Sequence, residues 1–155
     1  NEAFLTWDVA FEPGKLEVVG KKNDGTTTRY KVETAGAPAK IVLTPDRKSI
    51  LANKQDVCYV KVELVDEKGN LVPFADNKIS FEVTGAGKLA AVGNGNPASR
   101  TSFQGNKMEA WQGKCLAIIR SGEKVGKISL KAYADGLEEA MVNVNSIDAE
   151  KDVNR

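Results

Sequence analysis

The chain has 155 residues, of which 22 are Lys or Arg and 21 are Asp or Glu, so its formal net charge is +1 at pH 7. This balance provides no basic stripe for nucleic acid and no polybasic run for a membrane surface. The longest apolar runs, such as CLAII, are far shorter than the ~20 residues of a membrane-spanning helix. The chain has no histidine, which excludes Ser-His-Asp and Cys-His catalytic systems within it.

The first quarter of the chain predicts three β-strands: LTWDVAF (5–11), KLEVVGKK (15–22) and TTRYKVET (27–34). Period-two alternation, as in Tyr30 and Val32 against charged neighbours, indicates half-buried strands. Three strands are thin for a domain with its own core. We therefore expect residues 1–36 to be the C-terminal strands of a second, truncated β-sandwich domain. A start at Asn1 without methionine fits a piece excised from a longer protein.

Residues 37–147 predict one complete immunoglobulin-like antiparallel β-sandwich, which makes the fold class all-β. Seven to nine short strands alternate strictly between apolar and polar residues, for example over 60–64, 78–84, 128–133 and 140–146. Turns rich in Gly, Pro, Asn and Asp separate them. Residues 148–155 are a polar tail.

The two cysteines, Cys58 and Cys115, allow two readings. They could join two facing strands as a disulfide, as in immunoglobulin domains. They could also be two buried free thiols, which we favour because Cys58 shares the apolar phase of Val60, Val62 and Leu64.

The glycine- and asparagine-rich segment 90–108 raises the question of a ligand loop. A phosphate-binding glycine loop must lie between a strand and a helix, and nothing after Pro97 reads as a helix. The prediction is a loop that links two strands. Its alternative role is contact with a neighbouring domain or a sugar, through Asn94 and Asn96.

The acidic residues do not predict a catalytic pair or a metal site. A glycosidase needs two carboxyl groups facing each other across a cleft, whereas Glu17, Glu63 and Glu82 alternate with apolar residues on wet strand faces. The segment DEKGN, with Asp66 and Asn70, has too few oxygen ligands for calcium and predicts a hairpin turn. We expect no catalytic residue, no metal and no cofactor.

The order of several motifs resembles the C-terminal β-sandwich region of glycoside hydrolase family 2 enzymes, with β-galactosidase-like members the closest. The motifs are WDVAFEPGKLEVVGKKNDG, TAGAPAKIVLTPDR, VCYVKVELVDEKGNLVPFADNKISFEVTGAG, VGNGNPAS and WQGKCLAIIRSGEKVGKISLKAYADGL, over residues 7–145. The loop reads GNGNP, with Asn96 where an aspartate is expected, so no carboxylate is required there. In this family the chemistry takes place in a TIM barrel that precedes this region.

The resemblance implies a non-catalytic accessory domain that supports the catalytic barrel of a periplasmic or cell-surface bacterial glycosidase. Its partners would be the other domains of that enzyme, with carbohydrate or a homodimer through strand edges as further candidates. The alternatives are a carbohydrate-binding module and an adhesin-like immunoglobulin domain. Candidate contacts to glycan or neighbouring domains are Trp111, Tyr133, Tyr59, Phe74, Asn94 and Asn96, with Trp7 and Phe11 as additional packing residues.

Overall fold

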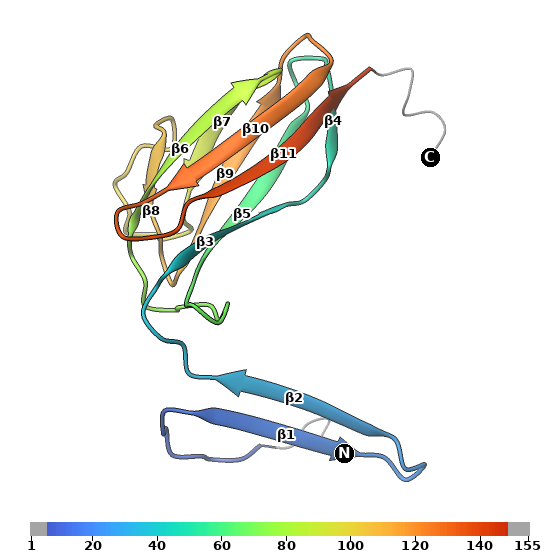
Figure 1. Ribbon diagram of the computed structural model, residues 1–155, viewed down its shortest axis with the longest axis vertical. Coiled ribbons are helices and arrows are strands. Elements are labelled where there is room, and N and C mark those ends of the chain that lie inside the picture. The colour runs from blue at the N-terminus through green and yellow to red at the C-terminus, as the bar shows by residue number, and fades with distance from the viewer. Residues whose placement is uncertain (1–5, 149–155) are drawn as a thin grey trace. The chain divides into compact units, whose positions relative to one another are not determined.

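A computed structural model of the chain describes residues 6–148 and confirms the all-β class (Figure 1). This range contains eleven strands and no helix. No helix there is therefore long and apolar enough to cross a membrane. The chain divides into two compact units, one ending at Thr34 and the other beginning at Ala35.

The first unit is a two-stranded antiparallel hairpin made of β1 (Lys15–Lys21) and β2 (Thr27–Glu33). At its turn, the Asp24 carboxylate accepts a hydrogen bond from the Thr26 N–H at 2.8 Å, and Gly25 takes a φ of 85°. The expected strand over 5–11 is wrong for its described residues, since 6–11 form no strand. Apolar alternation alone cannot make a strand, because a strand also needs a neighbour to satisfy its backbone.

The second unit is a sandwich of two sheets. The four-stranded sheet has the order β3 (Lys40–Pro45), β5 (Val57–Val65), β9 (Lys114–Ser121), β7 (Gly87–Gly93). The five-stranded sheet has the order β4 (Ser49–Leu51), β11 (Ala140–Ile147), β10 (Gly126–Tyr133), β6 (Lys78–Gly85), β8 (Lys107–Glu109). Within the described residues of this unit, all strand pairings are antiparallel except β4 with β11, which is parallel. An isolated bridge between Lys40 and Glu138 is parallel as well. These two short contacts depart from the expected antiparallel sheets.

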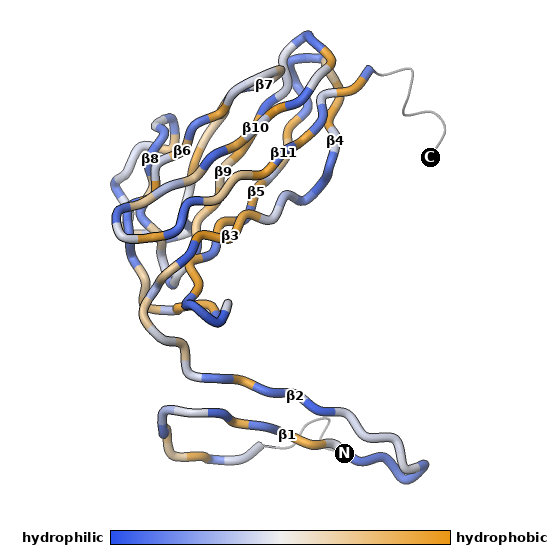
Figure 2. Tube along the Cα trace, in the orientation of Figure 1, coloured by the Kyte–Doolittle hydropathy of each residue, from blue (hydrophilic) through white to orange (hydrophobic). Residues whose placement is uncertain are grey.

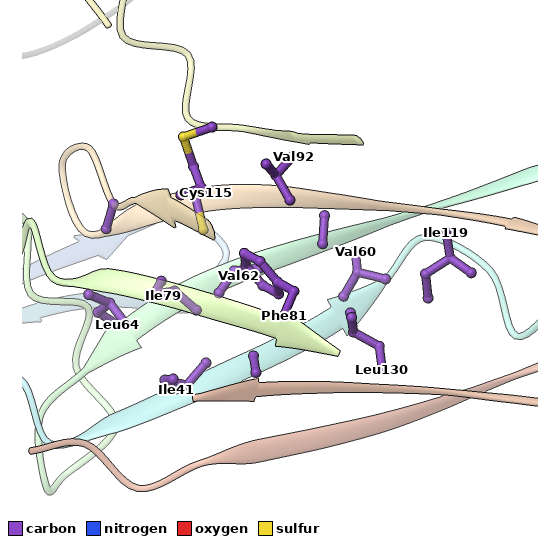
Figure 3. Packing of buried hydrophobic residues seen from close by; sticks show 14 of the residues in the cluster. Ile41, Val60, Val62, Leu64, Ile79, Phe81, Val92, Cys115, Ile119 and Leu130 are labelled. Atoms are coloured by element: carbon purple, nitrogen blue, oxygen red, sulfur yellow. The ribbon is translucent and has the colours of Figure 1, made fainter. Parts of the chain in front are cut away.

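The core lies between the two sheets and follows the predicted alternation. On β5, Val60, Val62 and Leu64 are fully buried, and on β10 so are Ile128 and Leu130. Strand β9 is apolar on both faces (Figure 2). Side chains from both sheets meet in one cluster, with Phe81 its largest fully buried member (Figure 3). The two inner faces thus bury one continuous apolar core.

Both cysteines are buried free thiols, as we favoured. They lie on neighbouring strands of the same sheet, where Cys58 is opposite Ile119 and Cys115 is opposite Val62. Four residues of strand therefore separate them along the ladder, which is about 13 Å at ~3.3 Å per residue. A disulfide needs Cα atoms within ~7 Å, so this geometry excludes the bond.

Candidate functional site

The six candidate contact residues do not form one site. Tyr59 lies on the outer face of the four-stranded sheet, and Tyr133 lies on the outer face of the five-stranded sheet. Both point away from the core, because each alternates with the buried residues of its strand. Because the two outer faces look in opposite directions, these two rings cannot form a shared platform for one sugar chain.

The ring of Tyr133 is engaged by its neighbours. Its hydroxyl donates to Glu82 Oε1 at 3.0 Å, and Lys131 Nζ lies 5.7 Å from its ring centroid. The hydrogen bond to the Glu82 carboxylate raises the pKa of Tyr133. Lys131 also pairs with Glu139 at 2.8 Å. A ligand would have to displace these contacts before stacking on this ring.

Phe74 and Trp111 lie on two loops at one end of the sandwich. Phe74 is in the β5–β6 connection and is 94% exposed, while Trp111 is in the β8–β9 turn and is 39% exposed. The loops are bonded to each other, because the Gly113 N–H donates to the Ala75 carbonyl at 3.1 Å. This is the end at which the chain enters the sandwich (Figure 1).

Asn94 and Asn96 stabilise the loop between β7 and β8. The Asn94 side chain accepts the Asn96 N–H at 3.0 Å and donates to the Glu109 carbonyl at 3.0 Å. The Asn96 side chain accepts the Ala98 N–H at 2.9 Å. These are Asx turns, in which the side chain shapes its own backbone. The segment links two strands, as expected, and no helix follows it within the described chain, but the loop is shorter than predicted because residues 90–93 belong to β7 and residues 107–108 to β8.

Asp66 forms the expected hairpin turn, and its oxygens are used by the protein itself. The carboxylate accepts the N–H groups of Gly36 at 2.9 Å, Lys68 at 2.9 Å and Asn70 at 2.8 Å. Hydrogen bonding, chiefly from Gly36, lowers the pKa of Asp66 to about 2. Within residues 6–148, no group of three or more His, Cys, Asp and Glu side chains could hold a metal ion.

A feature that the sequence reasoning missed lies on the outer face of the four-stranded sheet, near Tyr59. Lys88 on β7 lies directly opposite Arg120 on β9, and both residues line two hollows, of about 390 Å³ and about 400 Å³. Tyr59 lines the first of these hollows. In the sequence, Lys88 and Arg120 are single charged residues in separate segments. No local pattern predicts that they lie opposite each other.

Comparison with known proteins identifies the family. Residues 41–143 match the glycoside hydrolase family 2 C-terminal domain 5. The chain is 43% identical over 142 residues to β-galactosidase BoGH2A of Bacteroides ovatus, covering 92% of this chain and 17% of that enzyme. It is also 28% identical over 142 residues to a β-glucuronidase of Formosa agariphila, covering 90% of this chain and 14% of that enzyme.

A solved structure of similar fold comes from the same family. It is a glycosyl hydrolase family 2 member from Bacteroides cellulosilyticus, with a TM-score of 0.85 and 34% identity, covering 93% of this chain and 19% of that one. The chain therefore belongs to the glycoside hydrolase family 2 C-terminal domain 5 family, in agreement with the resemblance drawn from its motifs. It spans less than a fifth of the length of these relatives.

Proposed function

We propose that the chain is a non-catalytic accessory domain of a family 2 glycosidase, packed against the other domains of that enzyme and supporting its catalytic barrel. The observation that carries this proposal is the pair of exposed aromatic residues at one end of the sandwich. Phe74 is 94% exposed on a loop that hydrogen bonds hold in place. Two exposed aromatic side chains on hydrogen-bonded loops at the same end suit a packing contact with a neighbouring domain, because aromatic residues are enriched at such contacts.

The acidic chemistry supports a non-catalytic role. Asp66 is the one buried acidic residue within 6–148, and its pKa is lowered by the hydrogen bond from Gly36. A glycosidase acid needs a raised pKa and a second carboxyl group across a cleft. The purified chain should therefore not hydrolyse chromogenic β-galactosides or β-glucuronides, the substrates suggested by its relatives' names. Turnover by pure chain would overturn the proposal.

The supporting role is tested in the parent enzyme with Phe74→Ser. We expect this variant to lower the melting temperature of the parent enzyme and leave that of the isolated chain unchanged. The matched control is Val125→Ser, which alters a residue 60% exposed in the β9–β10 turn and should change neither. If Phe74→Ser leaves the parent enzyme as stable as Val125→Ser does, this end of the sandwich is not a packing surface.

The hairpin of the first unit supports the proposal that residues 1–36 complete a preceding β-domain. Leu16 pairs with Val32, and Val18 pairs with Tyr30, so these four residues share one face. All four are exposed in this chain. An isolated two-stranded hairpin is marginally stable, so further strands should cover this face in the parent. The alternative is that this face pairs with a second copy of the chain. Light scattering tests this alternative, because a dimer that Tyr30→Ser abolishes would favour pairing between copies.

We also propose that the parent enzyme acts in the periplasm or at the cell surface, as the family resemblance implies. Immunoblots of cytoplasmic, periplasmic and surface fractions of the source cells test this. Recovery in the cytoplasmic fraction alone would contradict it.

A further inference from the structure

The outer face of the four-stranded sheet carries a row of positive charge beside an exposed aromatic ring. Lys88, Arg120 and Val57 lie side by side on β7, β9 and β5 in one row of the ladder. Two rows further along the ladder, on the same face, Tyr59 lies opposite Ile118. Residues directly opposite each other point to the same face of a sheet. All five side chains therefore project outward, on the side away from the buried Cys58 and Ile119 of the same strands.

These side chains surround a hollow. It has a volume of about 390 Å³ and is lined by Tyr59, Val57, Ile118, Lys88 and Arg120, together with Gln104 from the β7–β8 loop. The hydrogen bond from the Val92 N–H to the Phe103 carbonyl, at 2.9 Å, holds this part of the loop against β7. Polar surface makes up more of its lining than apolar surface, so the hollow suits a polar ligand better than an apolar one.

The positive charge here is not neutralised by the protein. Like charges directly opposite each other destabilise a sheet, yet Lys88 and Arg120 are opposite and neither forms an ion pair within residues 6–148. Elsewhere on this face the positive charges are neutralised, because Lys61 and Lys114 both form ion pairs with Glu63, at 2.8 Å and 3.6 Å.

Two carboxylates next to lining residues, Asp46 and Asp56, have other partners. Asp46 accepts the Tyr59 N–H at 2.9 Å and pairs with Arg47 at 3.5 Å. Asp56 also pairs with Arg47, at 3.4 Å. The adjoining hollow of about 400 Å³, which shares Lys88 and Arg120, adds Lys54, Lys124 and Glu123. Glu123 pairs with Lys54, so an excess of positive charge remains and favours an anion.

Tyr59 supplies the second half of the site. This residue is 44% exposed, and unlike the Tyr133 ring its ring carries no cation over its face in the described chain. We propose that this face binds an acidic saccharide: Arg120 and Lys88 hold its carboxylate or sulfate group, and Tyr59 packs against a sugar ring. An arginine fork matches the geometry of such oxyanions, and an amphipathic ring suits the apolar face of a sugar. This inference does not depend on the packing role proposed above.

The test is affinity gel electrophoresis of the chain through three polysaccharides. Polygalacturonate presents carboxylates, carrageenan presents sulfate esters on galactose, and neutral galactan presents neither. We expect one acidic polymer to retard the chain and neutral galactan not to, with the retarding polymer identifying the anionic group. Equal retardation by galactan, or retardation in none of the gels, would overturn the proposal.

Variants separate a built site from general charge attraction. Arg120→Gln and Tyr59→Ala should each weaken binding roughly ten-fold. The matched control Lys61→Gln removes the same charge from an ion-paired residue of the same face and should change binding little. If Lys61→Gln weakens binding as much as Arg120→Gln, or if Tyr59→Ala has no effect, the interaction is non-specific and the proposal fails. Melting temperatures of all variants verify that each is folded.

Discussion

The Asp66 carboxylate accepts a hydrogen bond from the backbone N–H of Gly36 at 2.9 Å, across 30 residues of sequence. One side chain thereby closes the hairpin turn after β5 and fastens the segment that leads into β3. The same carboxylate accepts the N–H groups of Lys68 and Asn70 within its own turn. Asp66 is 5% exposed, so its partners are not readily replaced by water.

The first prediction concerns the dependence of stability on pH at this residue. The folded-state pKa of Asp66, about 2, lies below its ordinary value of 3.8 because Gly36 and the turn donate hydrogen bonds to the carboxylate. A lowered pKa means that the carboxylate stabilises the fold above about pH 4, and that this contribution is lost as pH falls towards 2. Asp66→Asn should therefore lower the melting temperature at pH 7 and differ less from wild type at pH 2.

Thermal unfolding followed by circular dichroism at pH 7, 4, 3 and 2 measures this difference. The control is Asp76→Asn, which removes an exposed carboxylate from the same β5–β6 connection. A constant difference between Asp66→Asn and wild type across this range would contradict the assigned role.

The second prediction concerns the tight turn between β8 and β9. Gly113 has a φ of 72°, and a Cβ atom there would lie 2.2 Å from the Val72 carbonyl oxygen. Gly136 has a similar φ of 76° with open space around it. Gly136→Ala should cost about 1–2 kcal/mol for the left-handed backbone alone. Gly113→Ala should cost more, since the backbone of residue 72 must also move, and equal losses in urea unfolding would contradict this.

The third prediction concerns the core. Leu130 on β10 is fully buried, whereas Met141 on the neighbouring strand β11 is 64% exposed. Leu130→Ala should lower the free energy of unfolding by about 2–5 kcal/mol through lost burial and a residual cavity. Met141→Ala should change it by less than about 0.5 kcal/mol. Chemical denaturation of both variants gives these values, and a small loss for Leu130→Ala would mean that the two sheets pack loosely there.

The fourth prediction concerns the thiols. Burial raises the pKa of Cys58 to about 11 and that of Cys115 to about 12, so both stay protonated at neutral pH. Since the thiolate is the reactive form, the native chain should not react with a thiol reagent at pH 8, while the denatured chain should react at both positions. The complementary measurement is the intact mass of the chain, recorded without reductant, which tests for a disulfide. A mass lower by two hydrogen atoms would reveal a disulfide and contradict the register of β5 and β9.

Alternation along the chain was sufficient to predict β5, β6, β10 and β11 and their side chains that face the core, whereas it did not predict β4, β7 and β8. Val60, Val62 and Leu64 are buried and Tyr59 is exposed, as their phase on β5 requires. This information is local, because successive residues of any strand point to opposite faces. The prediction fails where a strand depends on a partner, as in the segment around Trp7 and Val9, which alternates but forms no strand in the described chain.

The sequence by itself determined the β-class, the core positions and, through its ordered motifs, the family. Only the tertiary structure placed Lys88 opposite Arg120 and set Tyr59 beside them. Which residues face each other across strands depends on register, and register is fixed by long-range pairing. On β7 it shifts between Leu89 and Ala91, and an irregularity of this kind re-aims the residues around it. No pattern within a single strand carries that information.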